Sequence, residues 1–152
     1  MKERNAIIWT YCIEGRPITK KNGMIKTKNG VIQSVAYRKY EPDAIWQLIG
    51  QRRPPSPITR PVELCVFYYM EDKAGWPDFI GLLQATADIL EKAGILENDR
   101  LIVQISSQSG ICGIDKVNPR TIIQVREITD RDSIAYQLDP YIVKKVEAGE
   151  YD

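Results

Sequence analysis

The sequence of 152 residues contains no histidine. This absence excludes histidine general-base catalysis, and it excludes nucleophilic devices that pair histidine with serine or cysteine. Any hydrolysis by this chain would have to use carboxylates with a metal ion, or lysine.

Cysteine is scarce, and long apolar runs are missing. The three cysteines, Cys12, Cys65 and Cys112, are widely spaced and predict neither a disulfide framework nor a zinc site. Cys12 and Cys65 lie in strand-like runs, where we expect them to be buried. No run is apolar and long enough to span a bilayer, and the first residues show no signal-peptide pattern. We therefore expect a protein of the reducing cytoplasm, without a membrane partner.

A formal net charge of +1 conceals a strong segregation of charge along the chain. Residues 1–60 hold 12 Lys/Arg against 4 Asp/Glu, whereas residues 61–152 hold 9 against 16. A basic half suits a phosphate backbone and an acidic half suits a metal ion, although the two halves could also neutralise each other after folding. The three tryptophans, Trp9, Trp46 and Trp76, are expected in the core rather than stacked on bases.

The chain reads as alternating strands and helices. Strands are predicted over 6–14, 62–70, 101–106 and 121–128, and helices over 41–51 and 79–93. A lysine-rich loop over 15–30, a proline-rich connector over 52–61 and an acidic tail over 130–152 complete the chain. We therefore predict one α/β (α+β) domain over residues 1–152, with a mixed β-sheet and about two main helices packed on it.

The segment 76–102 carries the clearest helical pattern. Asp78, directly after Pro77, is expected at the N-cap, and Gly94 at the C′ position. At about 100° per residue, the helix has a broad apolar face formed by Phe79, Leu82, Leu83, Thr86, Ile89, Leu90 and Ala93. A second, polar face contains Gly81, Gln84, Asp88 and Lys92.

Two acids, Asp78 and Asp99, flank this helix. They can meet only if the following strand folds back beside the helix, and such a pair would suit a divalent metal ion. The alternative is an ordinary surface helix, in which Asp78 serves as a cap and Asp88 pairs with Lys92 four residues later.

The spacing of these residues resembles the signature of the RusA-like Holliday junction resolvase family. The matching positions in the helical segment are Pro77-Asp78, Leu82, Asp88-Ile89-Leu90, Ala93-Gly94-Ile95 and Asn98-Asp99. Near the start, Pro17-Ile18-Thr19-Lys20-Lys21-Asn22 is similar to the family's Pro-x-x-Lys-x-Asn element, and Asn118-Pro119-Arg120 also resembles a family feature. Together the matches span most of residues 6–128.

The resemblance implies metal-assisted hydrolysis of phosphodiester bonds. In that reading Asp78 and Asp99 hold Mg²⁺, or Mn²⁺ in its place, and Asp88 is a ligand or an orienting group. Lys20, Lys21 and Asn22 would contact nucleic acid. The family acts as a homodimer that nicks opposing strands of a four-way (Holliday) DNA junction in recombination and repair. Its members occur in bacteria and resident phages, so a prophage origin is expected.

Several family positions carry other residues here. The second motif acid is Ile80, the motif asparagine is Gly81, the motif lysine is Gln84, and the first acid of the late pair is Asn98. Three hypotheses stay open. The chain could be an active junction nuclease whose third acid is Glu97, Asp88 or Glu71. It could be a branched-DNA binding module without cleavage activity. It could also be an unrelated small α/β interaction protein.

Overall fold

The computed structural model describes residues 7–20, 25–27, 30–32, 35–129 and 149. Two of the predicted nucleic-acid contacts, Lys21 and Asn22, lie outside the described residues, as does almost all of the predicted tail over 130–152. Among the helices of the described part, none is long and apolar enough to cross a membrane.

Strands and helices alternate much as the sequence predicts. The elements in chain order are β1 (Ile8–Glu14), β2 (Ile25–Thr27), β3 (Gly30–Ile32), α1 (Val35–Ile49), β4 (Val62–Met70), α2 (Phe79–Lys92), the 3-10 helix η1 (Asp99–Leu101), β5 (Ile102–Ile105), β6 (Gly110–Ile114) and β7 (Arg120–Glu127).

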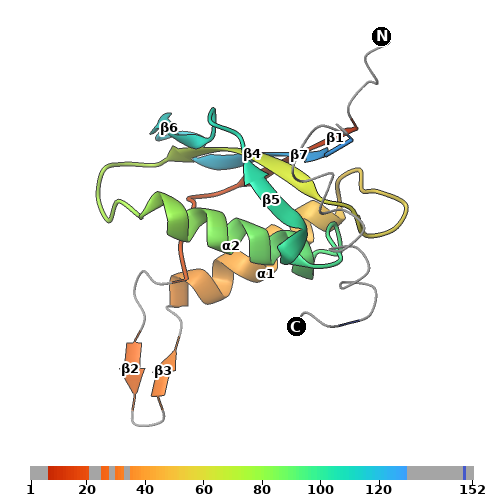
Figure 1. Cartoon of the computed structure of the whole chain (residues 1–152). Helices are drawn as coiled ribbons and strands as arrows, with labels where there is room; N and C mark the ends of the chain where they lie inside the picture. The colour runs from red at the N-terminus through yellow and green to blue at the C-terminus, as the bar shows by residue number, and fades with distance from the viewer. Residues whose placement is uncertain (1–6, 21–24, 28–29, 33–34, 130–148, 150–152) are drawn as a thin grey trace.

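A mixed five-stranded sheet forms the centre of the fold, and it confirms the predicted α+β class. Its order is β1-β7-β4-β5, with β6 also pairing β4. The pairs of β7 with β1 and with β4 are antiparallel, whereas β5 and β6 run parallel to β4. Both helices lie on the same face of this sheet, while β2 and β3 form a separate hairpin (Figure 1).

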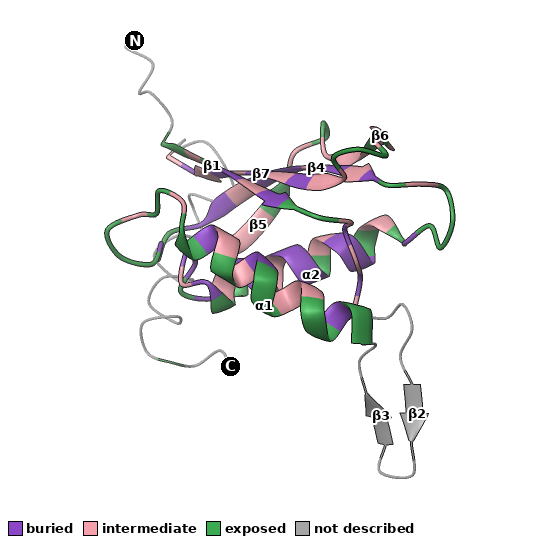
Figure 2. Cartoon of the chain, turned by 180° about the vertical axis from the view of Figure 1, so that it is seen from behind, coloured by how far each residue is buried: buried purple, intermediate pink, exposed green. Residues whose placement is uncertain are grey.

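The core lies between the helices and β4. Because β4 reads as a continuous apolar and aromatic run, it suits the centre of a sheet, and Val62, Leu64, Val66, Tyr68 and Met70 are buried. The hydroxyls of Tyr68 and Thr86 lie 2.6 Å apart and join β4 to α2. Figure 2 shows buried stretches along α2. Leu82, Thr86, Ile89 and Leu90 of the predicted apolar face are buried, as are Ala85 and also Gly81, which was predicted on the polar face.

The predicted start of the first helix is wrong. Glu41-Pro42 is expected to open it, yet α1 begins at Val35 and contains Pro42 in its eighth position. A proline there removes one backbone hydrogen bond. Burial of Tyr37, whose hydroxyl donates to Glu41 across 2.7 Å, favours the extra turns before the proline. Propensity alone could not predict this, because the compensation comes from tertiary contacts.

Three short strands, β2, β3 and β6, also escape the sequence pattern. The predicted loop over 15–30 contains β2, which pairs with β3 in the register Lys26↔Val31. The strand β6 has the sequence Gly-Ile-Cys-Gly-Ile, and its two glycines weaken any strand signal.

Expectations for isolated aromatic and thiol side chains are partly wrong. Trp46 is 74% exposed and Trp76 is 49% exposed, so neither belongs to the core. Cys65 is buried as predicted, but Cys12 is only half-buried because it lies on the edge strand β1.

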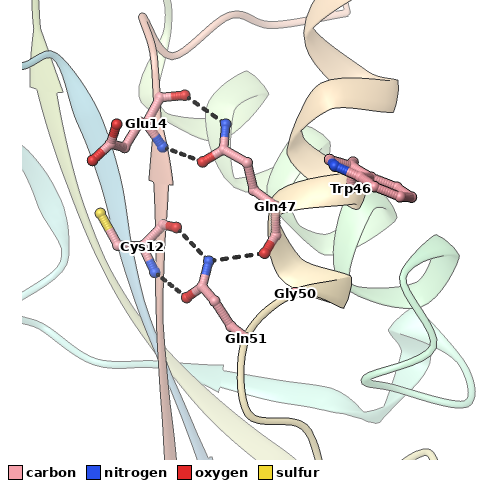
Figure 3. A pocket seen from close by; sticks show the side chains of 6 residues that line it. All are labelled: Cys12, Glu14, Trp46, Gln47, Gly50 and Gln51. Carbon is pink, nitrogen blue, oxygen red and sulfur yellow. Dashed lines mark hydrogen bonds between the residues drawn. The ribbon is translucent and has the colours of Figure 1, made fainter.

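Two glutamines, Gln47 in α1 and Gln51 two residues after the end of α1, close part of the free edge of β1 (Figure 3). The amide of Gln47 accepts from the backbone N–H of Glu14 at 2.8 Å and donates to its carbonyl at 3.0 Å. Gln51 makes the same pair of bonds with Cys12, at 3.1 and 2.8 Å. Backbone groups that face the free edge recur every second residue of β1, as at Cys12 and Glu14. Gln51 matches this spacing because its amide also donates to the carbonyl of Gln47 at 3.1 Å, which holds the two glutamines side by side. These amides take the place of a neighbouring strand.

This edge closure predicts a double effect of removing the amides. The variant Gln47→Ala/Gln51→Ala should lose about 1–3 kcal/mol of unfolding free energy, because each amide makes two modest hydrogen bonds. It should also self-associate more, because an unpaired strand edge recruits other strands. Urea denaturation and light scattering would measure the two effects. Gln108→Ala, at an exposed turn position, is the control and should change neither.

Candidate functional site

Asp78 caps the N-terminus of α2, as predicted. Its backbone is extended, with φ −75° and ψ 140°, and Oδ1 accepts from the backbone N–H of Gly81 at 3.0 Å. The residue is exposed, whereas the preceding Pro77 is buried and fixes the entry of the chain into the helix. One carboxylate oxygen therefore serves the cap while the side chain still faces solvent, where it also lies in the favourable field of the helix N-terminus.

Gly81 explains how this cap fits into the fold. A Cβ at residue 81 would lie 2.1 Å from Oδ1 of Asp78 and 3.1 Å from Cγ2 of Thr19. Thr19 is fully buried against this turn of α2. The glycine at the family's asparagine position thus makes room for both the capping carboxylate and the segment over residues 16–20, which we call the N-terminal strap.

The N-terminal strap also holds the loop that leads to Asp78. The guanidinium of Arg16 donates to the carbonyl of Ala74 and lies 3.4 Å from a carboxylate oxygen of Asp72. Arg16 therefore connects the end of β1 to the β4–α2 loop, four to six residues before Asp78. Sequence reasoning assigned no role to Arg16, because an isolated arginine in a lysine-rich loop gives no local signal.

Asp88 joins the strap to both helices. Its Oδ2 lies 2.5 Å from Nζ of Lys20 and 3.1 Å from Nζ of Lys92. Lys92 in turn lies 2.7 Å from Glu41 of α1, which accepts a hydrogen bond from Tyr37. The structure thus brings the predicted catalytic residue Asp88 and the predicted nucleic-acid contact Lys20 together as an ion pair. The predicted alternative, pairing of Asp88 with Lys92, is confirmed.

The electrostatics of Asp88 follow from these contacts. Burial raises the pKa of its carboxyl, but hydrogen bonds and charge from Lys20 and Lys92 outweigh burial and leave the pKa below the usual 3.8. The hydrogen bond to Glu41, together with Asp88, raises the pKa of Lys92. Both shifts favour the ionised forms of Asp88 and Lys92.

Asp99 lies at the other end of α2. It is the first residue of η1, and its backbone N–H donates to the side chain of Glu91 at 3.3 Å. The preceding Asn98 caps η1, because its side chain accepts from the backbone N–H of Arg100 at 2.9 Å. Asp99 is exposed, whereas Asn98 is buried. The neutral amide at the family's first acid position is thus a buried cap for η1.

The expectation that the following strand brings Asp78 and Asp99 together is not met within one chain. The strand β5 runs parallel to β4 and pairs with its first residues, so α2 must run back along the full length of β4. A helix of 14 residues is about 21 Å long, and the two acids lie at its opposite ends. Within the described ranges, no three acidic or cysteine side chains gather as a metal site.

Two of the four substituted family positions lie on the outer surface of α2. Ile80, in place of the second acid, is 76% exposed, and Gln84, in place of the lysine, is also exposed. Neither side chain supports the core, so neither substitution has a packing reason in the described structure.

The sequence of the chain is similar to known proteins of one family. The chain matches the family of "Endodeoxyribonuclease RusA" over residues 14–126. It is also 27% identical over 111 residues to the "Crossover junction endodeoxyribonuclease RusA" of Aquifex aeolicus (strain VF5), which covers 72% of this chain and 84% of the relative. The matched region runs from the end of β1 to β7, and so includes the strap, α2 and η1.

The chain therefore belongs to the RusA family of endodeoxyribonucleases. The resemblance stated from the residue pattern is confirmed, and the reading of the motif as an accident in an unrelated protein is excluded.

The contact between Gly81 and Asp78 predicts that replacing this glycine by alanine changes stability in the direction opposite to the usual one. Gly→Ala inside a helix normally stabilises by about 1 kcal/mol. Gly81→Ala should instead destabilise by about 1–3 kcal/mol, because the new methyl group displaces the capping carboxylate and presses on Thr19. Thermal or urea unfolding measures this. Gly113→Ala, where an added Cβ meets nothing within 4 Å, is the matched control; a stabilised Gly81→Ala variant would contradict the packing described here.

The ion pairs of Asp88 predict a pH dependence of stability. Because the folded-state pKa lies below 3.8, ionised Asp88 stabilises the fold above that pH, and the contribution is lost as the pH falls through the lower folded-state value. The difference in unfolding free energy between wild type and Asp88→Asn should therefore be constant from pH 5 to 7 and shrink below about pH 4. Urea unfolding across that range measures it, and a difference that grows in acid would refute the assignment.

Proposed function

We propose that this protein is a metal-dependent endonuclease that resolves four-way (Holliday) DNA junctions by paired nicks in recombination and repair. The observation that carries the proposal is family membership over 14–126, a stretch that holds the exposed capping acid Asp78. The relative from Aquifex aeolicus is named for cleavage of crossover junctions, which supports this choice of substrate. The chemistry agrees with the absence of histidine, since carboxylates can serve a hard divalent ion.

The proposed cofactor is Mg²⁺, with Mn²⁺ as a substitute, and it requires a second subunit. Residues of one chain do not fit such an ion, because Asp78 and Asp99 lie at opposite ends of α2. Both are exposed, so each can meet a carboxylate of another molecule. We infer a homodimer in which Asp78 of one subunit and Asp99 of its partner form each site. A bound divalent ion would supply positive charge at the scissile phosphate and a more acidic water.

Asp78 is the residue whose role is most directly derived from this chain. The helix N-terminus and the bond from Gly81 hold its carboxylate in one orientation, and the clamp of Arg16 on Ala74 fixes the preceding loop. Preorganised oxygen ligands of this kind bind Mg²⁺ without a large reorganisation cost. By contrast, Asp88 is engaged by two ammonium groups, so we assign it to positioning Lys20 rather than to the metal.

A second candidate is a branched-DNA binding protein with the same fold and an impaired site. It is favoured by one observation, namely that the positions of the family's second acid and lysine carry Ile80 and Gln84, both exposed. Without that acid a site has one ligand fewer, and without that lysine it has one positive charge fewer near the phosphate. Binding would then survive where cleavage does not.

The test combines cleavage with subunit mixing. Wild-type protein should nick a labelled four-way junction symmetrically with Mg²⁺ or Mn²⁺, but not with EDTA, and should spare a linear duplex. Asp78→Asn and Asp99→Asn should each abolish cleavage; asparagine still caps α2, so the fold is retained. Co-refolding the two inactive variants should restore single nicks, because each mixed dimer then holds one site with both acids.

The outcomes separate the alternatives. Restored nicking supports a site shared between subunits, and no restoration rules out that arrangement. A junction-specific gel shift without cleavage in any metal identifies the second candidate. Absence of both binding and cleavage rejects the two proposals together.

A further inference from the structure

Trp76 lines a surface pocket together with Lys73 and Ile114. The pocket has a volume of about 320 Å³ and opens to solvent, where Trp76 is 49% exposed and Ile114 is 40% exposed. Single exposed apolar side chains are common on protein surfaces. An aromatic and an aliphatic side chain that line one hollow, however, form a site for a ligand with an apolar face.

This pocket lies directly beside Asp78. Trp76 precedes Asp78 by two residues, so their Cα atoms are at most about 7 Å apart. Ile114, the last residue of β6, pairs with Met70 at the end of β4, and the backbone N–H of Asp115 donates to the carbonyl of Met70 at 2.7 Å. The end of β6 and the β4–α2 loop therefore lie at the same end of the sheet (Figure 1). A ligand in the pocket is consequently a close neighbour of whatever Asp78 binds.

The loop that carries Trp76 is held on both sides of the tryptophan. Before it, the backbone N–H of Ala74 donates to the carboxylate of Asp72 at 2.9 Å, and the carbonyl of Ala74 accepts from Arg16. After it, Pro77 is buried. The exposed indole is thus carried by a backbone that is already ordered, which lowers the entropic cost of binding a ligand.

The charges at the pocket suit an anionic ligand. Lys73 is exposed, and it forms no ion pair with any residue that the structure describes. The acids Asp72 and Asp115 on either side are paired with Arg16 and Arg120, at 3.4 and 3.0 Å. A ligand that combines a flat apolar ring with negative charge matches both the indole and the ammonium group, and a nucleotide has this combination.

We propose that Trp76 stacks on a base at the branch point of the DNA junction, while Lys73 contacts a neighbouring phosphate. Successive nucleotides of one strand are about 3.4 Å apart along the helix axis, so a base on Trp76 lies within about two nucleotides of a phosphate at Asp78. The inference rests on the proposed function for the identity of the nucleic acid. It adds a residue that selects branched over linear DNA.

The selectivity follows from the stacking of bases. Inside a linear duplex both faces of each base are covered by its neighbours, and uncovering one face costs free energy. At a branch point the strands leave one stack for another, so a base face is available to an aromatic side chain at a lower cost.

Stacking and phosphate contacts respond differently to salt, and this difference provides the test. Trp76→Ala should bind a labelled four-way junction roughly 5- to 100-fold more weakly than the wild type. The slope of log affinity against log salt concentration should stay the same, because an indole neutralises no phosphate. Affinity for a linear duplex should also stay the same. Trp76→Phe, which keeps an aromatic ring, should retain most of the affinity for the junction. Fluorescence anisotropy between about 0.05 and 0.3 M salt measures all of these quantities.

The matched control removes the same side chain elsewhere. Trp46, in α1, is 74% exposed, so Trp46→Ala deletes an equally large surface ring and should bind the junction like the wild type. Thermal melting verifies that each variant is folded, and size-exclusion chromatography compares subunit assembly. In the wild type, a junction with iodouracil at the branch point should cross-link under light to the peptide that contains Trp76, and not to the peptide that contains Trp46.

Four results would overturn the inference. Trp76→Ala could bind the junction like the wild type, or it could lose as much affinity for the linear duplex as for the junction. The control Trp46→Ala could be weakened to the same extent. Finally, Trp76→Ala could be a monomer where the wild type is a dimer, which would assign Trp76 to a contact between subunits.

The stacking and nuclease proposals fail in different ways. If the wild type binds the junction but cuts it with neither metal, the nuclease proposal fails, and the affinities of the two tryptophan variants still decide the stacking. If the wild type cuts the junction while Trp76→Ala binds it with full affinity, the stacking is refuted and the nuclease proposal stands. A wild-type protein that does not bind junction DNA at all refutes both.

Discussion

The parallel pairing of β4 with β5 is the constraint on which the rest of this structure depends. Two parallel strands cannot be joined by a tight turn, so the connection must return over the full length of β4. The helix α2 makes this return across one face of the sheet (Figure 1). As a result its N-terminus, with Asp78, lies beyond the end of β4, and its C-terminus, with Asp99, lies at the beginning of β5. One backbone hydrogen-bond pattern thus separates two acids that the sequence spacing suggests as partners.

This separation changes how the family motif is read. In the homodimer that we propose, a signature that extends over both ends of one helix supplies two half-sites, one at each end of α2. Asp78 is held by the helix N-terminus and Asp99 by η1, and both are exposed. The reason for proposing two copies is therefore local, since the helix α2 separates Asp78 from Asp99 within one chain. The two-fold symmetry of a four-way junction suits such an assembly.

The charged cluster on α2 has a second role in the architecture. Four charges that balance in pairs tolerate partial burial, because each ammonium group lies next to a carboxylate. The cluster connects the strap, α1 and α2, which are far apart in sequence. The amides of Gln47 and Gln51, in and just after α1, stabilise the sheet edge in a similar way, since they take the place of a neighbouring strand for β1. Polar side chains therefore add to the apolar core in holding β1, the strap and the two helices together.

Elements whose structure depends on residues close in sequence were predicted correctly, whereas elements that depend on distant residues were not. The strand β4 is recognisable because its own residues are apolar and β-branched or aromatic, and its predicted bounds agree with the structure. The same holds for α2, whose cap at Asp78 and left-handed Gly94, with φ +75°, depend on neighbours within one turn. By contrast, the start of α1 was predicted too late in the sequence, at Glu41-Pro42. The burial of Tyr37 stabilises the helical turns before Pro42 despite the helix-breaking tendency of proline. The strand β6 escaped prediction because its pairing with β4, rather than its glycine-rich sequence, defines it.

The sequence by itself determined the class of fold, the family and the identity of the capping acid, because periodicity and motif spacing express interactions between near neighbours. Only the tertiary structure decided which of the candidate residues meet. It joined Lys20 to Asp88, at 68 positions' separation, and it kept Asp78 from Asp99, which are 21 positions apart. Distance along a chain does not give distance in space once a parallel crossover is formed, because the hydrogen bonds between strands set the direction in which the helix must run.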